Sequence, residues 1–567
     1  MPPKATEEQA IFWTSRKMQD VIDEFDKCPT QTYCHVLDTN SRETPGYGTL
    51  YLLFLYLFNL KEYALQVRNL LEFVDNVEQT RKNRRLWFPK MPVKKWFRSS
   101  EIDPEIGGDM GDYGQHGIDN ELSLVRTLTR TETENNRDDL FNQPKYQQGK
   151  LYHRDPDVDP PTTFVQRSFY KLWRFSNWFI EPDTFFAFKT AVGVVLLAIP
   201  AFRQQDAAWY SSWRGQWAMI TLVLWNFPMA GAFNFSLITR VAGSIAGGIL
   251  GIVAWEISRG NPYGLAIVLL IIILYCYHVF LFSPTYKPVA LMTKVTMILV
   301  ALYEFQYVAE GIPYHDQVWT VAGKRVLLVV IGLVAAYVLS LIPHPLSGRV
   351  ELRKRLAKTI RDIGRLYAIL ASKFMVTGMD FVYPTPDQVK CFHKLSLEIR
   401  RQIADGRNLL FHTDYEPPLR GRFPKESYAK ILDKVEDMTD LVLGMGHAMR
   451  QINPLWRKQI AMTLSIERLD YLTCIMTTLK LLSTTLAAKM ALPPYMQRPV
   501  HSRFRLAKAL ETKIQIGPAE IANPSFPAYS SYMLNSFTFV SELDVLLEVV
   551  EDLVGVESPE EWLRTHV

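Results

Sequence analysis

Four basic side chains fall inside or at the ends of long apolar stretches of this 567-residue chain. Lys294 lies about a third of the way along one stretch, and Lys287 precedes it by seven residues on the same helical face. Arg240 and Arg325 lie near the starts of two other stretches. A charge at the centre of a bilayer costs about 2.5–3.5 kcal/mol on insertion scales, so it is expected to be paired or to line a wet path. We interpret these four residues as a candidate path for a substrate or an ion. For the two arginines, anchoring at a membrane surface is the alternative.

The chemistry expected of such a path is the binding of organic anions. Positive charge in a low-dielectric interior attracts carboxylates strongly, because little water screens it. Trp217, Trp225 and Tyr303 could stack on an aromatic acid, although packing is the commoner use of each ring. Glu256 and Glu304 are candidate partners for the buried lysine.

Other chemistries lack the residues they need. The five cysteines are dispersed, and the one close pair, Cys28 and Cys34, has no second pair to complete a zinc site. The motifs G-x-x-x-x-G-K-[ST], H-E-x-x-H and G-x-S-x-G do not occur. The net charge of +5 comes without a basic–aromatic stripe of the kind that binds nucleic acid. We expect no enzymatic activity, no cofactor, no metal and no nucleic-acid partner, and we expect any active transport to use an ion gradient.

The elements that position the basic residues are six apolar segments. Residues 185–342 carry nine Lys/Arg and five Asp/Glu, out of 63 and 58 in the whole chain. Segments of about 20 residues that are apolar all round are typical of membrane spans, and backbone groups in lipid must be satisfied within each segment, which requires helices. The sequence therefore predicts an all-α membrane protein with a six-helix bundle. The predicted spans are 185–202, 215–233, 238–257, 264–282, 288–306 and 321–342.

An internal repeat is predicted from two matching positions. Arg240 and Arg325 are each followed by valine and, seven residues later, by Gly247 and Gly332. The separation of 85 residues covers three spans. Because three is an odd number, the two halves would be inverted in the membrane as a 3+3 repeat, which is a common construction in transporters.

Glycines mark the expected contacts between helices. Gly243, Gly247 and Gly251 lie on one helical face, and Gly332 occupies the matching place in the other half. Small residues let helix backbones approach closely, so we interpret these four glycines as packing positions. A direct role in binding a substrate is the weaker alternative.

Orientation follows from the placement of basic residues. Residues 343–375 hold eight Lys/Arg against two Asp/Glu, whereas the stretch 305–317 holds no Lys or Arg and two acidic residues, Glu310 and Asp316. Cytosolic flanks of membrane spans are enriched in Lys and Arg. An even number of spans therefore puts both termini in the cytosol, with the lipid bilayer as an obligatory partner.

The remaining sequence divides by composition. An apolar run opens a long predicted helix over 47–82, but its 11 residues are too few to cross a bilayer, so we expect it to pack on protein. Residues 164–180 mix aromatic and basic side chains, which is typical of a helix at the headgroup level. The predicted parts are a polar N-terminal region (1–98), a disordered linker (99–163), the membrane domain with its leading interfacial helix (164–343) and a cytosolic helical domain (344–567).

Two groups of residues resemble a known family. The stretch WAMITLVLWNFPMAGAFNFSLITRVAGSIAGGILG, from Trp217, resembles a helix pair of the fusaric acid resistance / aromatic acid exporter superfamily, including its Pro228 and its Arg-x-x-Gly-x-x-x-Gly pattern from Arg240. EPPLRGRFP and YSSYMLNSFTFVSELDVLLEVVEDLVG resemble the brefeldin A sensitivity-related tail of its fungal branch. The resemblance implies a transporter of the endoplasmic reticulum or plasma membrane.

The resemblance has one departure. Members of this branch are longer and carry an additional N-terminal membrane bundle that is missing from this sequence. A path that needs both bundles would require a homodimer or a partner membrane bundle.

From the basic path residues and the resemblance together, we expect a protein that exports organic anions such as aromatic carboxylates. The alternatives are a passive anion channel and a membrane-anchored scaffold, in which case the chain would be a truncated member of the family.

Overall fold

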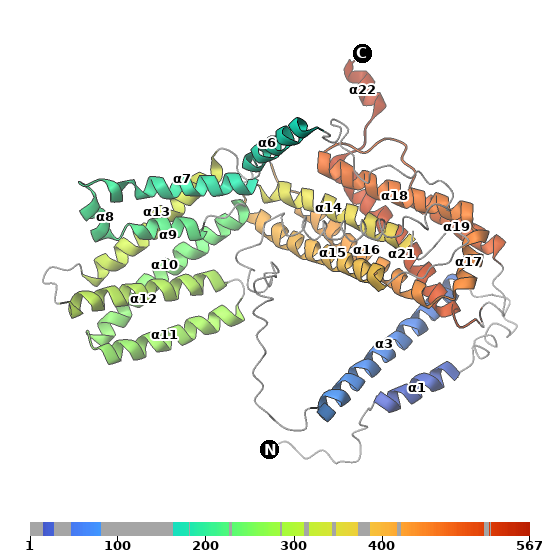
Figure 1. The fold of residues 1–567 in the computed structure, drawn as a ribbon, viewed down its shortest axis with the longest axis horizontal. Helices are drawn as coiled ribbons and strands as arrows, with labels where there is room; N and C mark the ends of the chain where they lie inside the picture. Colours follow the sequence, from blue (N-terminus) through green and yellow to red (C-terminus); the bar gives the residue numbers. More distant parts are fainter. Residues whose placement is uncertain are drawn as a thin grey trace. The chain divides into compact units, whose positions relative to one another are not determined.

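The computed structural model is built from helices and divides into two compact units (Figure 1). One unit comprises Pro92–Glu351 and Phe411–Arg422, and we call it the membrane unit. The other comprises Met1–Met91, Leu352–Leu410 and Phe423–Val567, and we call it the helical unit. The predicted linker 99–163 lies outside the described residues, Thr163 excepted. The structure describes residues 15–27, 47–80, 163–180, 182–225, 230–283, 286–310, 317–342, 347–371, 386–416, 421–514, 521 and 523–566.

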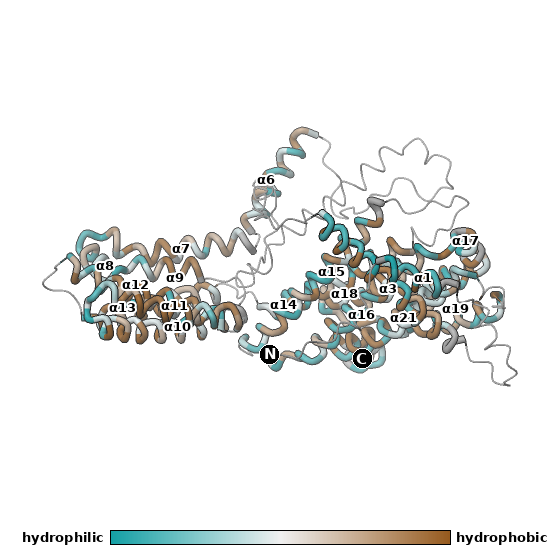
Figure 2. Tube along the Cα trace, turned by 90° about the horizontal axis from the view of Figure 1, so that it is seen from below, coloured by the Kyte–Doolittle hydropathy of each residue, from teal (hydrophilic) through white to brown (hydrophobic). Residues whose placement is uncertain are grey.

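The membrane unit is a bundle in which long helices pack in pairs. α10 packs on α12 and α13, α13 packs on α9, and α11 lies against α10 and α12. These helices are hydrophobic along most of their length (Figure 2). The elements are α6 (Phe164–Ile180), α7 (Pro182–Phe202), α8 (Ala207–Trp213), α9 (Gln216–Trp225), α10 (Ala230–Ser258), α11 (Pro262–Phe282), α12 (Lys287–Ala309), α13 (Val318–Leu341) and the 3₁₀ turn η4 (Thr413–Tyr415).

The outward faces of this unit are apolar. Only 11% of the apolar windows of α7 and α11 are buried within the bundle. The exposed side chains of α11 include Ile267, Leu270, Ile271 and Leu274. A water-soluble bundle would turn a polar face outward, whereas a helix that is apolar all round needs an apolar surrounding. The unit is therefore embedded in a lipid bilayer, as the sequence predicted.

The second predicted span differs from the structure. In place of one helix over 215–233, α9 ends at Trp225 and a new helix, α10, begins at Ala230 and runs for 29 residues. Pro228 lies in the interval, and proline lacks the N–H that a continuous helix requires. The other five predicted spans each correspond to one described helix, and each of those helices is long and apolar enough to cross a membrane.

The leading helix α6 buries none of its described side chains in the bundle. Its exposed residues include Phe169, Trp173, Trp178 and Phe179. Exposed aromatic rings beside basic side chains suit the membrane–water interface, which was the sequence prediction for this helix.

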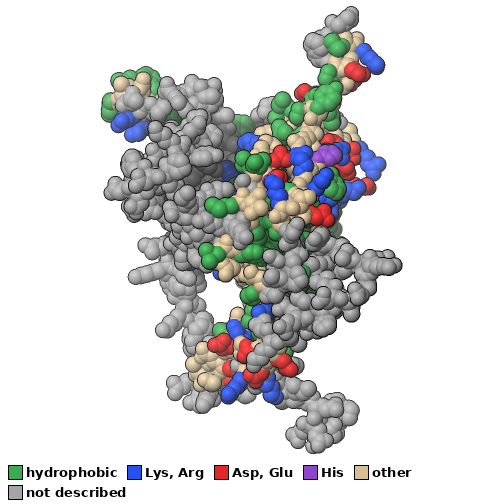
Figure 3. Space-filling view, turned by 90° about the vertical axis from the view of Figure 1, so that its right-hand side faces the viewer, with side chains coloured by type: hydrophobic (Ala, Val, Ile, Leu, Met, Phe, Trp, Pro, Cys, Tyr) green, Lys and Arg blue, Asp and Glu red, His purple; other side chains and the backbone are tan. Residues whose placement is uncertain are grey.

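The helical unit is an α-bundle in which α21 is central, since it packs on α3, α16, α18 and α19. On the face drawn in Figure 3, acidic and basic side chains are interspersed among the described residues. The helices are α1 (Ser15–Lys27), α3 (Tyr47–Thr80), α14 (Gly348–Ile369), α15 (Pro386–His412), α16 (Lys425–Gln451), α17 (Pro454–Thr463), α18 (Ser465–Ala488), α19 (Pro499–Lys513), α21 (Phe526–Val554) and α22 (Pro559–His566); the first residues of α14 and the last of α15 fall in the membrane unit.

The apolar start of α3 packs on protein, as predicted. Phe54 is 1% exposed and its ring meets that of Phe526 edge-on at 5.0 Å. Tyr51 stacks on the same ring at 6.3 Å, and Phe58 is also buried. The short apolar run at the start of α3 is therefore one side of the core of the helical unit.

α18 has the length and mean hydropathy of a membrane span, yet its environment is that of a soluble bundle. Half of the window Ile466–Ala488 is buried. Its exposed positions Thr473, Thr477, Lys480 and Thr484 form a polar stripe at intervals of three or four residues. A lipid-facing helix would carry its apolar side chains on that stripe, as α11 does. α18 is thus a core helix of the helical unit.

From its apolar pattern, the sequence of this unit predicts single helices over 455–490 and 527–556. The first of these is two helices, α17 and α18, because Leu464 leaves helical geometry at φ −110° and ψ 25°. The second corresponds to α21, which ends at Val554. α19 has no counterpart among the predicted helices.

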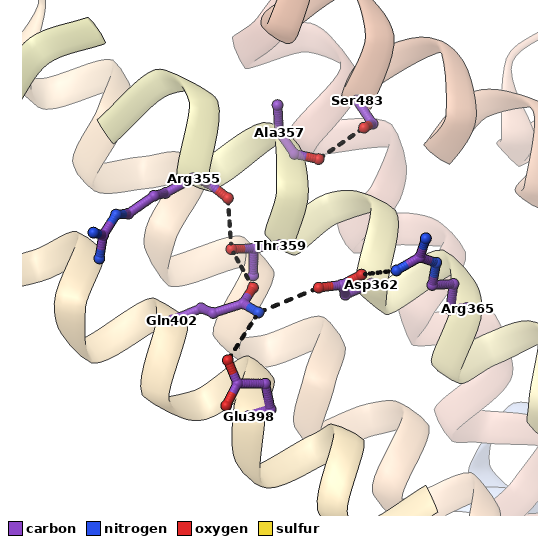
Figure 4. Close-up of polar contacts among 8 residues, drawn as sticks. All are labelled: Arg355, Ala357, Thr359, Asp362, Arg365, Glu398, Gln402 and Ser483. Carbon is purple, nitrogen blue, oxygen red and sulfur yellow. Dashed lines mark hydrogen bonds and ion pairs between the residues drawn. The ribbon is translucent and has the colours of Figure 1, made fainter. Parts of the chain in front are cut away.

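Buried polar side chains fix the register of α14 against α15 (Figure 4). The Gln402 side chain accepts a hydrogen bond from Thr359 Oγ1 at 3.1 Å and donates to Asp362 at 3.2 Å. Asp362 is fully buried and also pairs with Arg365 at 2.9 Å. Ser483 of α18 donates to the backbone carbonyl of Ala357 at 2.7 Å. Buried polar groups without such partners would destabilise the bundle by about 1–3 kcal/mol each, so this network specifies one arrangement.

Candidate functional site: a cation–aromatic cluster in the membrane unit

Three cations of the membrane unit gather around aromatic rings at one end of the bundle. Arg214 closes α8, whereas Lys324 and Arg325 are the seventh and eighth residues of α13. Together with rings from α8, α9 and α12 they line a cavity of about 20 Å³. We call this set the cation–aromatic cluster. Its charged and aromatic members are Trp213, Arg214, Trp217, Tyr303, Tyr307, Lys324 and Arg325.

A tight turn between α8 and α9 positions the first of these cations. Arg214 adopts a left-handed conformation at φ 56° and caps α8 by donating its backbone N–H to the carbonyls of Ser211 and Tyr210. A Cβ atom at Gly215 would lie 2.3 Å from the Tyr210 ring, so the ring packs directly against the glycine. The turn brings Arg214 and Trp217 to the same cavity.

The cluster is a continuous stack of cations and rings. Arg325 is 5% exposed, and its guanidinium lies 3.9 Å from the centre of the Trp217 ring. Trp217 Nε1 donates a hydrogen bond to the hydroxyl of Tyr303 at 2.9 Å. The guanidinium of Arg214 covers the other end of the stack, 3.7 Å from the Tyr303 ring. Each cation–π contact stabilises its cation by about 0.5–2 kcal/mol and fixes the position of the charge.

Ring contacts hold the cations at the cavity. None of the described residues that line the cavity is Asp or Glu. Positive groups around one cavity attract an anion. The aromatic walls add a surface for a flat apolar body. The arrangement is therefore chemically suited to a negative group beside aromatic rings.

Lys294, one of the four predicted path residues, does not belong to the cation–aromatic cluster. Its side chain is 9% exposed, and its ammonium lies 3.8 Å from the Tyr277 ring and 4.6 Å from the Phe280 ring, both on α11. Nine residues separate it from Tyr303 on α12, which is about 14 Å at the rise of an α-helix. Lys294 and the cation–aromatic cluster are thus different places in the bundle.

The other predicted path residues also fall outside the cluster. Arg240 is 1% exposed within α10, and Lys287 is the half-buried first residue of α12. Glu304 is 3% exposed but lies ten residues from Lys294 on the same helix, about 15 Å away, so the predicted pairing of the two is wrong. Of the four basic residues singled out, only Arg325 belongs to the cluster.

The predicted packing glycines lie at close helix crossings. A Cβ at Gly243 would lie 2.7 Å from the carbonyl oxygen of Val289, and one at Gly247 would lie 2.5 Å from that of Thr293. At Gly251 the nearest atom would be the Val300 Cβ at 2.9 Å. All three faces meet α12, so α10 and α12 approach more closely there than side chains allow.

The second half of the bundle repeats this crossing. A Cβ at Gly332 would lie 2.6 Å from the Ala218 carbonyl oxygen and 2.8 Å from the Thr221 Cβ. At Gly247 the corresponding atoms are the Thr293 oxygen and the Thr296 Cβ, the latter at 2.8 Å. The third helix thus meets the fifth as the sixth meets the second, which is the pairing that a 3+3 repeat requires.

The start of α10 is fastened to the segment 411–416. Asn234 donates a hydrogen bond to the Tyr415 carbonyl at 3.0 Å, and the ring of Phe235 lies 4.9 Å from that of Tyr415. Glu416, the first residue of EPPLRGRFP, accepts hydrogen bonds from Ser347 Oγ and from the backbone N–H of Gly348 at the start of α14. The carboxylate thereby satisfies an N–H that helix formation leaves without a partner.

Sequence reasoning missed half of the cluster. Arg214, Trp213 and Tyr307 lie in or near turns and helix ends, where the sequence gives no periodic signal that connects them. The position of Lys324 at the end of a predicted span favours a role in anchoring the helix at the membrane surface. The usable signal was the short spacing of Trp213, Arg214 and Trp217, which places two rings and a cation on a single turn.

The long apolar helices and their outward apolar faces define a helical integral membrane protein. Comparison with known proteins narrows this class. Residues 185–339 match the family described as fusaric acid resistance protein-like, and residues 347–558 match the brefeldin A-sensitivity protein 4-like domain. The chain thus combines these two domains, and the resemblance predicted from the sequence is confirmed.

Two fungal relatives align with most of this chain. An uncharacterized protein of Schizosaccharomyces pombe is 26% identical over 414 residues, which cover 72% of this chain and 29% of that protein. The protein BRE4 of Eremothecium gossypii is 19% identical over 422 residues, which cover 68% of this chain and 39% of that protein. The chain therefore aligns with well under half the length of these curated relatives.

Proposed function

We propose that the membrane unit transports organic anions, such as aromatic carboxylates, and that the cation–aromatic cluster is an anion-binding site at one mouth of its path. The observation that carries the proposal is the stack of Arg325, Trp217, Tyr303 and Arg214 around a cavity whose described lining has no carboxylate. The fusaric acid resistance protein-like match over 185–339 supports transport as the use of this site.

The physical argument rests on where the cluster lies. Arg325 is buried beside apolar helices, where the effective dielectric constant is far below that of water. At an effective value of about 20, a unit charge 4 Å away contributes about 4 kcal/mol, against about 1 kcal/mol in water. A carboxylate entering the cavity thus recovers in charge attraction much of what it loses in hydration, while its ring replaces water on the indole and phenol faces.

Topology and location complete the proposal. The basic flank 343–375 and the acidic stretch 305–317 favour cytosolic termini, with the cluster on the far face of the bilayer and Arg240 nearer the cytosol. Arg240 and Lys294 would then line the part of the path that lies away from the cation–aromatic cluster. Export from the cytosol, residence in the endoplasmic reticulum or plasma membrane, and action as a homodimer or with a second membrane bundle belong to this proposal.

The test is uptake of radiolabelled benzoate into proteoliposomes that contain the full chain. Arg325→Gln removes the buried cation while keeping a polar side chain, and we expect it to raise the KM for benzoate at least tenfold. Arg203→Gln, which changes an exposed arginine paired with Asp206 on the same bundle, is the matched control and should leave uptake unchanged. Equal KM values for both variants and the wild type would refute the role of the cluster.

Carrier and channel are separated in the same vesicles. A carrier saturates with benzoate and responds to a proton gradient, whereas a channel gives a current that follows the imposed voltage. Failure of the wild-type chain to move benzoate in either assay would favour the membrane-anchored scaffold.

A further inference from the structure

Two stripes of opposite character run along α6. Arg167, Lys171 and Arg174 are four and three residues apart, so they lie on one face of the helix. The opposite face repeats this spacing with apolar residues, interrupted by Ser176: Val165, Phe169, Leu172 and Phe179. Hydrophilic and hydrophobic residues accordingly alternate along α6 (Figure 2). The helix is therefore amphipathic, with a basic stripe opposite an apolar stripe.

The packing of α6 on α7 leaves both stripes uncovered. Every side chain from Phe164 to Phe179 is exposed. On the apolar stripe, Phe169 is 66% exposed and Leu172 is 62% exposed. A continuous exposed apolar surface marks a place that contacts a membrane or another protein.

The helix that follows α6 favours the membrane as the partner of the apolar stripe. α7 begins at Pro182, two residues after α6 ends at Ile180, and its apolar window begins at Thr184. The C-terminal end of α6 is therefore held at the level where the first span enters the bilayer. The apolar stripe is thus next to the acyl chains, and a protein partner would have to compete with them for it.

Three aromatic rings gather at this end of α6. The ring of Phe179 meets that of Phe175 edge-on at 5.0 Å and that of Trp178 at 5.1 Å. The rings of Phe175 and Trp178 stack at 6.1 Å. Aromatic residues, Trp above all, are enriched at the headgroup level of a bilayer. A helix anchored there lies in the plane of the interface, with its apolar side among the acyl chains and its polar side among the headgroups.

The basic stripe determines which headgroups suit this helix. Residues 164–180 include no Asp or Glu, and the next acidic residue, Glu181, follows Arg174 by seven positions. Long Lys and Arg side chains extend away from apolar surface and place their charges at the depth of the lipid phosphates. An anionic lipid surface favours the bound state about fivefold for each nearby Lys or Arg, so three together correspond to about a hundredfold.

We propose that α6 is a binding surface for anionic phospholipids, with Arg167, Lys171 and Arg174 on the headgroups and the apolar stripe among the acyl chains. A guanidinium forms paired hydrogen bonds with phosphate oxygens, so the two arginines also fix the position of the headgroup. The inference does not rest on the transport function proposed above, and no residue of the cation–aromatic cluster takes part in it.

The test is amide hydrogen exchange of the full chain in nanodiscs of two compositions. One contains phosphatidylcholine alone, and the other contains phosphatidylcholine with about 30 mol% phosphatidylserine. We expect exchange over residues 164–180 to be at least tenfold slower with phosphatidylserine. Phosphatidylglycerol in its place should have the same effect, because the two lipids share their negative charge. The difference should vanish in 1 M KCl, where the screening length is about 3 Å.

Three variants separate charge from apolar contact. The combined Arg167→Gln, Lys171→Gln and Arg174→Gln variant should lose the effect of phosphatidylserine and exchange as the wild type does in phosphatidylcholine. Arg167→Lys with Arg174→Lys keeps the charge and should keep the effect. Phe169→Ser should speed exchange over α6 by the same factor in both compositions. Unchanged exchange over α10 and α12 shows in each case that the bundle is folded.

Three results would overturn the proposal. Equal exchange over α6 in the two compositions, whether slow or fast, would show that anionic lipid is not its partner. A phosphatidylserine effect that survives in the combined glutamine variant would show that the basic stripe is not responsible. Loss of the effect in the lysine variant would show that positive charge alone does not produce it.

Discussion

Neighbouring glycines on α10 allow the close crossing with α12 to be tested with a matched pair. A methyl group at Gly247 would lie 2.5 Å from the Thr293 carbonyl oxygen, which is backbone and cannot rotate away. A methyl group at Gly248 would lie 3.5 Å from a Val326 methyl, which is ordinary van der Waals contact. Gly247→Ala and Gly248→Ala therefore make the same chemical change on adjacent positions of one helix.

The expected magnitudes follow from two opposing contributions. Alanine stabilises a helix relative to glycine by about 0.5–1 kcal/mol at both positions. At position 247 the helices must also separate by several tenths of an ångström along the crossing, and such overpacking costs about 1–3 kcal/mol. We expect Gly248→Ala to be neutral or slightly stabilising and Gly247→Ala to be destabilising by about 0.5–2 kcal/mol.

The assay is thermal unfolding of the purified chain in detergent, with a second matched pair on α13. Gly332→Ala should behave like Gly247→Ala, because its methyl would lie 2.6 Å from the Ala218 carbonyl oxygen. Gly323→Ala should behave like Gly248→Ala, because no atom lies within 4 Å of its methyl. For a domain of this size the expected loss corresponds to a fall in Tm of roughly 1–8 °C. Equal Tm values within each pair would refute the close crossings.

Three further changes test the helical unit and its junction. Gln402→Leu leaves Thr359 and Asp362 without their shared partner and should lower the free energy of unfolding by about 1–3 kcal/mol in chemical unfolding. Arg400→Gln breaks an exposed ion pair with Asp440 and should change the free energy of unfolding by less than about 1 kcal/mol. Similar losses in the two variants would contradict the buried network. Burial raises the pKa of Asp544 above its ordinary value of 3.8, so the folded state disfavours the charged form. Stability therefore rises as the pH falls from above the folded pKa of Asp544 toward 3.8. Asp544→Asn removes the charge, so it should raise the Tm at pH 7 but not below about pH 3.5. An effect on the Tm that does not depend on pH would show that the charge of Asp544 is not responsible for it. Glu416→Ala removes the acceptor for the Gly348 N–H and should lower the Tm of the membrane unit, with a cost of about 1–2 kcal/mol; an unchanged Tm would mean that water replaces the carboxylate without loss.

The helices of the membrane unit could be predicted because composition alone determines them. The composition of a stretch such as Pro262–Phe282 predicts a helix in an apolar environment. The break between α9 and α10 was visible as Pro228, but two spans of ordinary length fitted the same sequence equally well. α18 shows the opposite case, because its length and hydropathy match a span while its polar exposed stripe does not.

The cation–aromatic cluster was only partly predictable, for a physical reason. Arg325 was visible because a charge in an apolar segment is costly and therefore informative. Its partners come from three other elements, and a sequence does not give the distance between α12 and the turn at Arg214. Lys294 illustrates the same limit, since its aromatic partners Tyr277 and Phe280 lie on a neighbouring helix and contribute no charge to the pattern.

The most direct test of the central claim compares the two charge types on one molecular skeleton. Proteoliposomes that contain the full chain are given radiolabelled benzoate or benzylammonium, which share an aromatic ring and differ in the sign of the charge. The cation–aromatic cluster predicts saturable uptake of benzoate and no uptake of benzylammonium above that of protein-free vesicles. Uptake of benzylammonium equal to or greater than that of benzoate would contradict the anion path.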